Sequence, residues 1–245
     1  MPLLLKSYRR SYLNEDIVVE RRYEGGIWHD TLEEVPNVVT NRQISNRAVV
    51  IGNGTSRNQI PLQHLKNPSG LLGAKTVQTY GCNALYRDFN PDFLVATGNE
   101  IVSELASSSY VENNIVYTAS IHLLEYPNKF YLIPKNPYLD AGSTALYLAA
   151  FDGHKKIWML GFDGQDGGTM NNNVYAGSNG YDAIDVVHLN DKLVRNQKSV
   201  FDVYNDVEFV RVTLHGTEKV PELWKQCPNF RQTNLRGFVV EADLS

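Results

Sequence analysis

A strand that ends in a turn of glycine, amide and hydroxyl residues is the first place where this sequence could bind a ligand. The apolar residues 48–51 predict a buried strand, and the turn that follows consists of Gly52, Asn53, Gly54, Thr55 and Ser56. Glycine lets a backbone approach a ligand closely, and short polar side chains cap helices or hydrogen-bond phosphate. The turn lacks the third glycine of a dinucleotide fingerprint and the lysine of a P-loop. Two interpretations stay open: a phosphate- or nucleotide-binding turn, or an ordinary tight connection.

A loop rich in glycine, asparagine and aspartate spans residues 161–181 and follows a predicted strand at 157–160. Open α/β sheets bind ligands at the edge where their strands end, and a loop of this length is a lid, a binding loop or a solvated insertion. Its neighbourhood contains four carboxylates, at Asp163, Asp166, Asp182 and Asp185. Paired carboxylates can hold Mg²⁺, but loop aspartates commonly just form turns. We retain only Asp163 as a candidate, because it follows directly on a strand and a glycine.

His188 is a candidate general base, since it lies beyond the loop and shortly before a predicted helix at 191–204. A neutral imidazole can take the proton from a hydroxyl that attacks another group. The alternative is a residue at the start of a helix with no catalytic part. The other five histidines have no metal-ligand spacing, and the two cysteines, Cys82 and Cys227, are too few for a cysteine cluster. We therefore predict no metal site and two free thiols.

Alternating strand and helix patterns from residue 47 onward predict the elements that must position these residues. The fold class is α/β, Rossmann-like, with a mostly parallel sheet flanked by helices. Residues 1–45 are predicted to be an irregular N-terminal extension, and residues 46–245 the Rossmann-like domain. The predicted strands are Ala48–Ile51, Thr76–Thr79, Phe93–Ala96, Ile115–Thr118, Phe130–Ile133, Lys156–Leu160 and Glu208–Val212. The predicted helices are Pro61–Leu65 (a brief turn), Glu100–Ser107, Ser143–Phe151 and Asp191–Tyr204.

Composition excludes several classes of protein. The formal net charge is −4, from 23 basic and 27 acidic residues mixed along 245 residues, so no electrostatic footprint for nucleic acid is present. No apolar run approaches the roughly 20 residues that span a bilayer, so no transmembrane segment is expected. The apolar start gives way at once to Lys6, Arg9 and Arg10, which is not the pattern of a secretory signal. We expect a cytoplasmic protein, and the sequence is compatible with a homo-oligomer.

Three segments taken together resemble one family. They are Ile51-Gly52-Asn53-Gly54-Thr55-Ser56, then Tyr80-Gly81-Cys82-Asn83-Ala84-Leu85-Tyr86, and then Gly142-Ser143-Thr144-Ala145-Leu146-Tyr147 leading into Lys156-Ile157-Trp158-Met159-Leu160-Gly161-Phe162-Asp163. Their order and spacing resemble the bacterial sialyltransferases of glycosyltransferase family 42 and the related DUF115, or MptE-like, proteins. The resemblance covers roughly residues 47 to 215 and leaves the N-terminal extension unexplained.

The resemblance implies a Rossmann-like fold with a cytidine monophosphate (CMP) sugar across the carboxyl edge of the sheet. It places Asn53 and Gly54 on the nucleotide-binding turn, and Asn83 and Asn99 on amides that contact the nucleotide or sugar. Gly142 and Ser143 match a helix start that binds the nucleotide, where backbone N–H groups lack intrahelical partners. His188 matches the general base of the family.

One departure concerns the tyrosines with which the family stabilises the departing phosphate. The position closest to the first of them is Gly164, while Tyr175 and Tyr181 are available in the loop. The sequence therefore predicts a glycosyltransferase-like enzyme that transfers the sugar of a CMP-linked acid sugar, such as CMP-sialic acid, to a glycan or other acceptor hydroxyl. It needs no cofactor besides this donor. The alternatives are a Mg²⁺-dependent, ATP-using diphosphokinase of the MptE-like type centred on Asp163, or a non-catalytic protein that keeps the fold.

Overall fold

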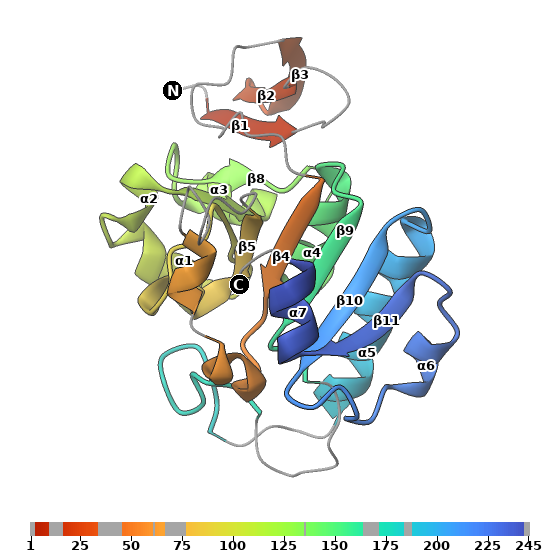
Figure 1. Cartoon of the computed structure of the whole chain (residues 1–245). Helices are drawn as coiled ribbons and strands as arrows, with labels where there is room; N and C mark the ends of the chain where they lie inside the picture. The colour runs from red at the N-terminus through yellow and green to blue at the C-terminus, as the bar shows by residue number, and fades with distance from the viewer. Residues whose placement is uncertain are drawn as a thin grey trace.

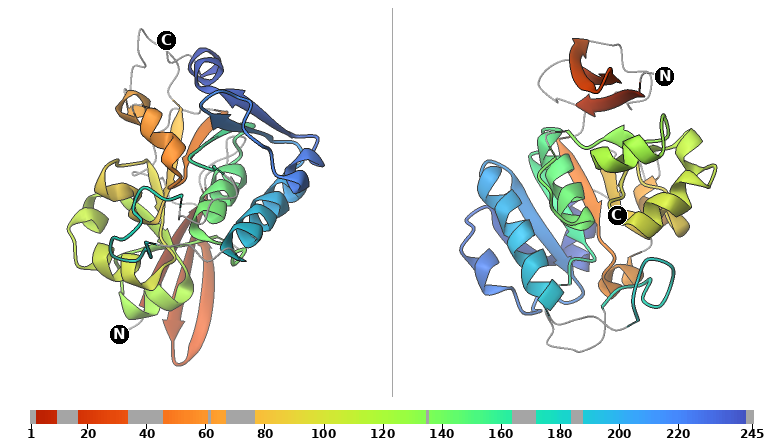
Figure 2. Two further views of the ribbon diagram at one scale, coloured as in Figure 1. Left: turned by 90° about the horizontal axis from the view of Figure 1, so that it is seen from below. Right: turned by 180° about the vertical axis from the view of Figure 1, so that it is seen from behind.

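The computed structural model describes residues 3–9, 17–33, 46–60, 62–66, 77–134, 136–163, 172–183 and 188–242. It contains a three-stranded antiparallel sheet and an eight-stranded sheet in which all neighbouring strands are parallel (Figure 1). Helices cover both faces of the larger sheet (Figure 2). The predicted α/β, Rossmann-like class is confirmed.

The larger sheet and its helices are built from elements that alternate along the chain. The strands are β4 (Arg47–Ile51), β5 (Gln78–Cys82), β6 (Phe93–Val95), β7 (Ile115–Thr118), β8 (Tyr131–Leu132), β9 (Lys156–Leu160), β10 (Glu208–Thr213) and β11 (Phe230–Asn234). The α-helices are α1 (Asn99–Ala106), α2 (Tyr110–Asn113), α3 (Ser120–Glu125), α4 (Ala141–Phe151), α5 (His188–Val203), α6 (Glu222–Lys225) and α7 (Leu235–Glu241). Short 3₁₀ helices are η1 (Thr55–Gln59), η2 (Leu62–Lys66) and η4 (Asn83–Arg87).

The strand order β11-β10-β9-β4-β5-β6-β7-β8 puts β4 and β9 at the centre of the sheet. Central strands of a parallel sheet are buried on both faces, and residues 48–51 and 157–160 are accordingly all buried. Alternate side chains enter two separate cores. Ala48 and Val50 pack with α4, α5 and α6, while Val49 and Ile51 pack with α1, α3 and α7.

The N-terminal extension contains more regular structure than the sequence pattern indicates. Strands β1 (Leu3–Arg9), β2 (Ile17–Glu24) and β3 (Ile27–Glu33) form an antiparallel sheet, and Gly25 and Gly26 make the hairpin turn with positive φ angles. The sequence had predicted an irregular extension for residues 1–45. Pairing with neighbouring strands, which sequence periodicity does not reveal, makes β1, β2 and β3 full strands.

The predicted elements agree with the structure within a few residues, with three notable differences. β5 extends to Cys82, so the second of the three family-like segments begins inside a strand. α5 begins at His188, whereas the sequence had placed this histidine before the helix. Strand β11 and the helices α2, α3, α6 and α7 were not predicted. Of the other predicted boundaries, Pro61 and Thr76 lie outside the described residues.

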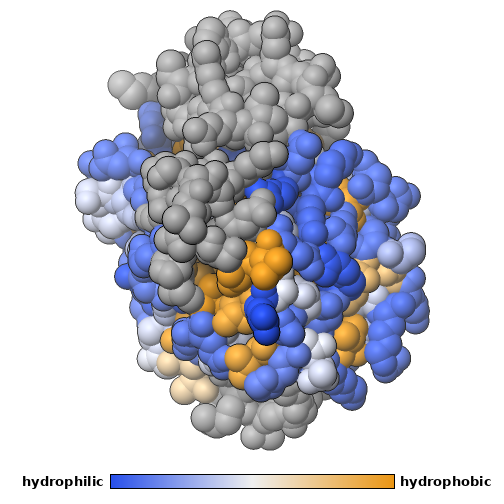
Figure 3. All heavy atoms as spheres, in the orientation of Figure 1, coloured by the Kyte–Doolittle hydropathy of each residue, from blue (hydrophilic) through white to orange (hydrophobic). Residues whose placement is uncertain are grey.

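Hydrophilic residues cover most of the face shown in Figure 3, around a few apolar patches. Among the described residues, no helix is both long and apolar enough to cross a bilayer.

Candidate functional site at the centre of the sheet

The two central strands end where the chain changes direction across the sheet. From β4 the chain continues to β5 on one side, whereas from β9 it continues to β10 on the other side. The connections after these neighbouring strands therefore diverge, which is the switch point where open parallel sheets bind ligands. Most of the predicted site residues lie in the segments that leave this edge: the turn after β4, the turn after β9 and residues 172–183 (Figure 1).

The glycines of the turn after β4 pack against the turn after β9. Gly52 N donates to Leu160 O over 2.8 Å, and Gly54 N donates to Gly161 O over 2.9 Å. A Cβ on Gly52 would lie 2.7 Å from Gly161 O, and one on Gly54 would lie 2.6 Å from both Gly161 O and the Asp163 carboxylate. The close approach that these glycines permit is thus to another backbone turn of the same protein.

Asp163 joins the same two turns through its side chain. Its carboxylate accepts from Ser56 N over 3.0 Å and from the Ser56 hydroxyl. Its carbonyl oxygen accepts from the guanidinium of Arg211, a buried residue of β10 that also donates to Lys219 O. Asp163 therefore has a positional role between β4, β9 and β10. In the described part of the chain, no group of three or more His, Cys, Asp or Glu side chains could hold a metal ion.

Residues 172–183 lie against the turn after β4. Asn172 Oδ1 accepts from Thr55 N over 3.0 Å and from Thr55 Oγ1, and Val174 N donates to Asn53 O over 2.8 Å. The Asn53 amide donates to the Tyr181 hydroxyl over 2.9 Å. This segment, which we call the covering segment, thus contacts two of the residues that the sequence assigned to nucleotide binding, Asn53 and Thr55.

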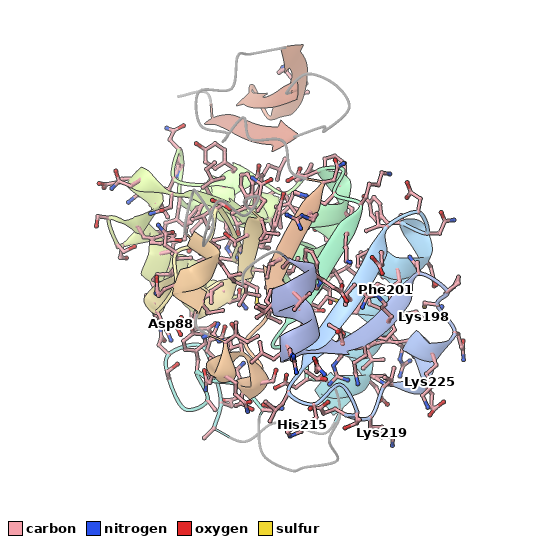
Figure 4. The ribbon with its side chains drawn as sticks, viewed as in Figure 1. Asp88, Lys198, Phe201, His215, Lys219 and Lys225 are labelled. Carbon is pink, nitrogen blue, oxygen red and sulfur yellow. The ribbon has the colours of Figure 1, made fainter. Side chains whose placement is uncertain are left out.

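Tyr175 and Tyr181 belong to the covering segment, and their hydroxyls bind it to residues outside the segment. The Tyr175 hydroxyl accepts from the buried Arg57 over 2.7 Å and donates to Asp88 over 2.5 Å (Figure 4). Arg57 also binds Asp88 directly over 2.8 Å. Burial raises the pKa of both tyrosine hydroxyls, so both stay protonated at neutral pH.

The Tyr181 hydroxyl has one unused hydrogen-bonding function. Its oxygen accepts from the Asn53 amide and from Ala84 N at 3.4 Å. Among the residues that the structure describes, the hydroxyl donates no hydrogen bond, and the buried Asn53 Oδ1 accepts none. A donor and an acceptor with spare capacity therefore lie next to each other at the end of β4.

Cys82 and Asn83 close the neighbouring strand β5. Asn83 has φ 45°, in the left-handed region that asparagine tolerates better than most residues, and its Oδ1 accepts from Thr97 N over 3.1 Å. Burial raises the pKa of the Cys82 thiol to about 12, against the opposing effect of the Arg57 charge. Cys82 is therefore a neutral thiol at physiological pH. Both cysteines are free, as predicted, and both are buried.

The start of α4 reaches the same edge of the sheet. A Cβ on Gly142 would lie 3.8 Å from the Phe162 ring and 3.9 Å from Cys82 Sγ. Asp140 caps the helix, because its carboxylate accepts from Ser143 N over 2.9 Å and from Ser143 Oγ over 2.6 Å. The Asn196 amide of α5 donates to the same carboxylate over 2.9 Å. Ser143 is thus fully engaged by a carboxylate in this structure.

Two predicted residues begin helices at this edge. His188 is the first residue of α5, and Figures 1 and 2 show the start of α5 at the end of the sheet where β4 and β9 end. Asn99 is the first residue of α1, after β6, and is exposed. Gly164, Asp166 and Asp185 lie outside the described residues.

Sequence reasoning missed three residues of this site: Arg57, Asp88 and Asp140. Asp140 had a readable signal, since an aspartate three residues before Ser143 is a standard N-cap pattern. Arg57 had none, because a buried arginine looks like a surface arginine in sequence. Its burial depends on Gly52 O, Asp88 and Tyr175, which come from three different segments.

A second arginine fixes the far end of the covering segment. Arg87 binds Glu104 of α1 over 2.6 Å and also donates to Ser178 Oγ over 2.8 Å and Asn179 O over 3.1 Å. The hydrogen bond from Arg87 lowers the pKa of Glu104 from 4.5 to about 2. A carboxyl with a lowered folded-state pKa stabilises the fold above its ordinary pKa, and this contribution is lost as the pH falls toward 2.

Removing this anchor should loosen the covering segment alone. We expect Arg87→Ala to cost the segment about 1 kcal/mol, and so to speed amide hydrogen exchange in residues 175–181 roughly fivefold. Lowering the pH from 4.5 toward 2 should have the same effect after correction for intrinsic exchange rates. Lys225→Ala, which breaks an exposed ion pair with Glu222 on α6, is the control and should leave the segment unchanged. Unaltered exchange in Arg87→Ala would contradict the anchoring role.

The fold resembles one known enzyme structure remotely. Over 80% of this chain and 85% of the other, it is similar to the apo form of the alpha-2,3-sialyltransferase from Campylobacter jejuni, with a TM-score of 0.42 and 14% sequence identity. Neither a protein-family model nor a curated protein matches the sequence.

Proposed function

We propose that this protein is a glycosyltransferase-like enzyme that binds a CMP-linked acid sugar at the ends of β4, β5 and β9 and transfers the sugar to an acceptor hydroxyl. The observation that carries the proposal is the unused hydrogen-bonding capacity at the switch point. In the described residues, the Tyr181 hydroxyl donates no hydrogen bond and the Asn53 Oδ1 atom accepts none. A nucleoside monophosphate offers an acceptor for the Tyr181 proton and a donor for Asn53 Oδ1, since its phosphate accepts hydrogen bonds and its sugar and base donate them.

In the proposed reaction the acceptor oxygen attacks the anomeric carbon of the donor sugar. The new bond forms between these two atoms, the bond from the anomeric carbon to the phosphate oxygen breaks, and CMP leaves. His188 takes the proton of the acceptor hydroxyl. Tyr181, whose raised pKa keeps it protonated, donates to a phosphate oxygen as negative charge develops there.

The covering segment must move for a nucleotide to reach the turn after β4. Thr55, Ser56 and Ser143 donate to Asn172, Asp163 and Asp140, so none of these hydroxyls is open to a ligand as the structure stands. The contacts of Thr55 lie on the exposed side and involve the covering segment, whereas Asp163 and Asp140 are half-buried and accept hydrogen bonds that hold the turn after β4 and the start of α4. We therefore expect Asn53 and Thr55 to exchange their hydrogen bonds to the covering segment for hydrogen bonds to the nucleotide. Asp163 should keep its hydrogen bonds to Ser56.

Thermal denaturation with and without CMP tests the proposal. At a concentration a hundred times its dissociation constant, CMP should stabilise the protein by about 2.7 kcal/mol. For a chain of this length, that is a rise in Tm of roughly 5–10 °C, and Mg²⁺ should not change it. Tyr181→Phe should reduce the shift, because it keeps the ring and removes the donor. Tyr126→Phe should not, since no hydrogen bond of the Tyr126 hydroxyl exists among the described residues.

The outcomes separate the alternatives. A shift with ATP only in the presence of Mg²⁺ would favour a diphosphokinase centred on Asp163. Flat responses to CMP, CMP-sialic acid and ATP would favour a non-catalytic protein. An equal CMP shift in wild type and Tyr181→Phe would remove Tyr181 from the nucleotide site.

A further inference from the structure

An exposed aromatic residue stands in a strained backbone conformation just before α4. Tyr138 has φ 56°, a region in which bulky residues are rarely found, and it is 86% exposed. Burial of the ring therefore does not offset the unfavourable backbone. Outliers of this kind concentrate at ligand-binding positions, where the surroundings hold them.

The neighbouring residues hold Tyr138 in this conformation. Asn136 Oδ1 accepts from Tyr138 N over 2.9 Å, and Pro137 between them has a ring-fixed φ. In a turn with proline second and a positive φ third, glycine or asparagine normally occupies the third position. Leu139 packs on the core, and its carbonyl oxygen accepts from Thr144 Oγ1 over 3.3 Å. The ring is thus presented to solvent from a fixed backbone.

Tyr138 also lies on the rim of the proposed site. Residues 133–140 run from the end of β8 to the start of α4, so they follow the carboxyl edge of the sheet. Two residues after Tyr138, Asp140 caps α4 and binds Asn196 of α5. The first turn of α4 lies beside Phe162 and Cys82, at the ends of β9 and β5.

We propose that Tyr138 is a stacking platform for a pyranose ring of the acceptor glycan. A pyranose has an apolar C–H face that packs against an aromatic ring, while its hydroxyl groups stay in water or reach the tyrosine hydroxyl. The turn after β4 lies beneath the covering segment and is the proposed nucleotide site. The highly exposed Tyr138 ring on the rim can instead be reached by the acceptor, which binds after the donor. This inference names the acceptor class for the proposed function and rests on it.

The test uses two variants that separate the ring from the backbone. Tyr138→Gly removes the ring and fits the positive φ without strain, so its Tm should equal or exceed that of wild type. Tyr138→Phe keeps the ring. In saturation-transfer NMR with methyl β-galactopyranoside and methyl β-glucopyranoside in the presence of CMP, Tyr138→Gly should bind the better ligand about five- to tenfold more weakly than wild type. Tyr138→Phe should stay within about twofold of wild type, because the face of the ring is preserved.

The controls keep the two proposals apart. Tyr138→Gly should retain the full thermal shift with CMP. Loss of this shift would mean that the Tyr138 ring binds the nucleotide, and it would overturn the proposed stacking platform for the acceptor. Equal pyranoside affinity in wild type and Tyr138→Gly, or no pyranoside binding to wild type, would also overturn it. Pyranoside binding that depends on Tyr138, without any CMP shift in wild type, would support the platform and count against the CMP-sugar donor.

Discussion

Replacing Gly161 with alanine should lower the free energy of unfolding by about 2–5 kcal/mol, the largest stability effect we expect at this site. Gly161 has φ +68°, which costs a residue with a Cβ about 1–2 kcal/mol. The added Cβ would also lie 2.8 Å from Gly52 O, a backbone atom that cannot rotate away. Overpacking of this kind typically costs another 1–3 kcal/mol. Urea denaturation measures the sum, which corresponds to a fall in Tm of roughly 5–15 °C.

Gly177→Ala is the matched control for Gly161→Ala. Gly177 has φ +79°, but its nearest neighbour, the Cβ of Ala183, would lie at an ordinary 3.8 Å. It therefore has the same backbone penalty without the collision, and we expect a loss of about 1 kcal/mol. The difference between the two variants measures the close packing of the turns after β4 and β9. Equal losses would show that the turns can separate at no cost.

This packing shows how far a glycine pattern can be interpreted from sequence. The strand at residues 48–51 was predictable, because a continuous run of buried apolar residues identifies a central parallel strand. The glycines after it indicated a close backbone approach to a ligand, and the structure shows a close approach to the turn after β9. The partner was not predictable, because Gly161 lies more than a hundred residues away and pairs with Gly52 only through the strand order.

Two of the elements that sequence reasoning missed, β11 and α7, share a physical cause. β11 is an edge strand whose residues, Phe-Arg-Gln-Thr-Asn, are only partly buried, so it lacks the apolar run that marks central strands. α7, which follows it, has a single buried residue, Phe238. Pairing with β10 and packing on Trp158 create both elements. Such tertiary contacts override weak local patterns.

The residues of the candidate site also fall into two groups, those that predicted elements place and those that only tertiary contacts place. Asn53 and His188 could be assigned to this edge from the predicted strands and helices, whereas Asn83 was assigned to it through the family resemblance. Contacts between loops could not, because they depend on which segments meet. The pairing of Ser56 with Asp163 and that of Arg57 with Tyr175 join segments more than a hundred residues apart.

The largest catalytic effect is expected at His188. If His188 removes the proton of the acceptor hydroxyl, His188→Ala should reduce the rate of sugar transfer from CMP-sialic acid about 10²–10⁴-fold, the usual contribution of a general base. The thermal shift with CMP should remain, because a base that acts on the acceptor does not hold the nucleotide. Release of CMP, followed by chromatography, measures both transfer and donor hydrolysis.

His215 offers a control for His188, because it is a second histidine at the same edge of the sheet (Figure 4). It follows β10 and is exposed, and its backbone N–H donates to Glu218 over 2.9 Å. His215→Ala should keep nearly full activity, and added imidazole should restore part of the rate in His188→Ala but not change that of His215→Ala. The opposite pattern would transfer the role of base to His215. Full activity in both variants would exclude both His188 and His215 as the base.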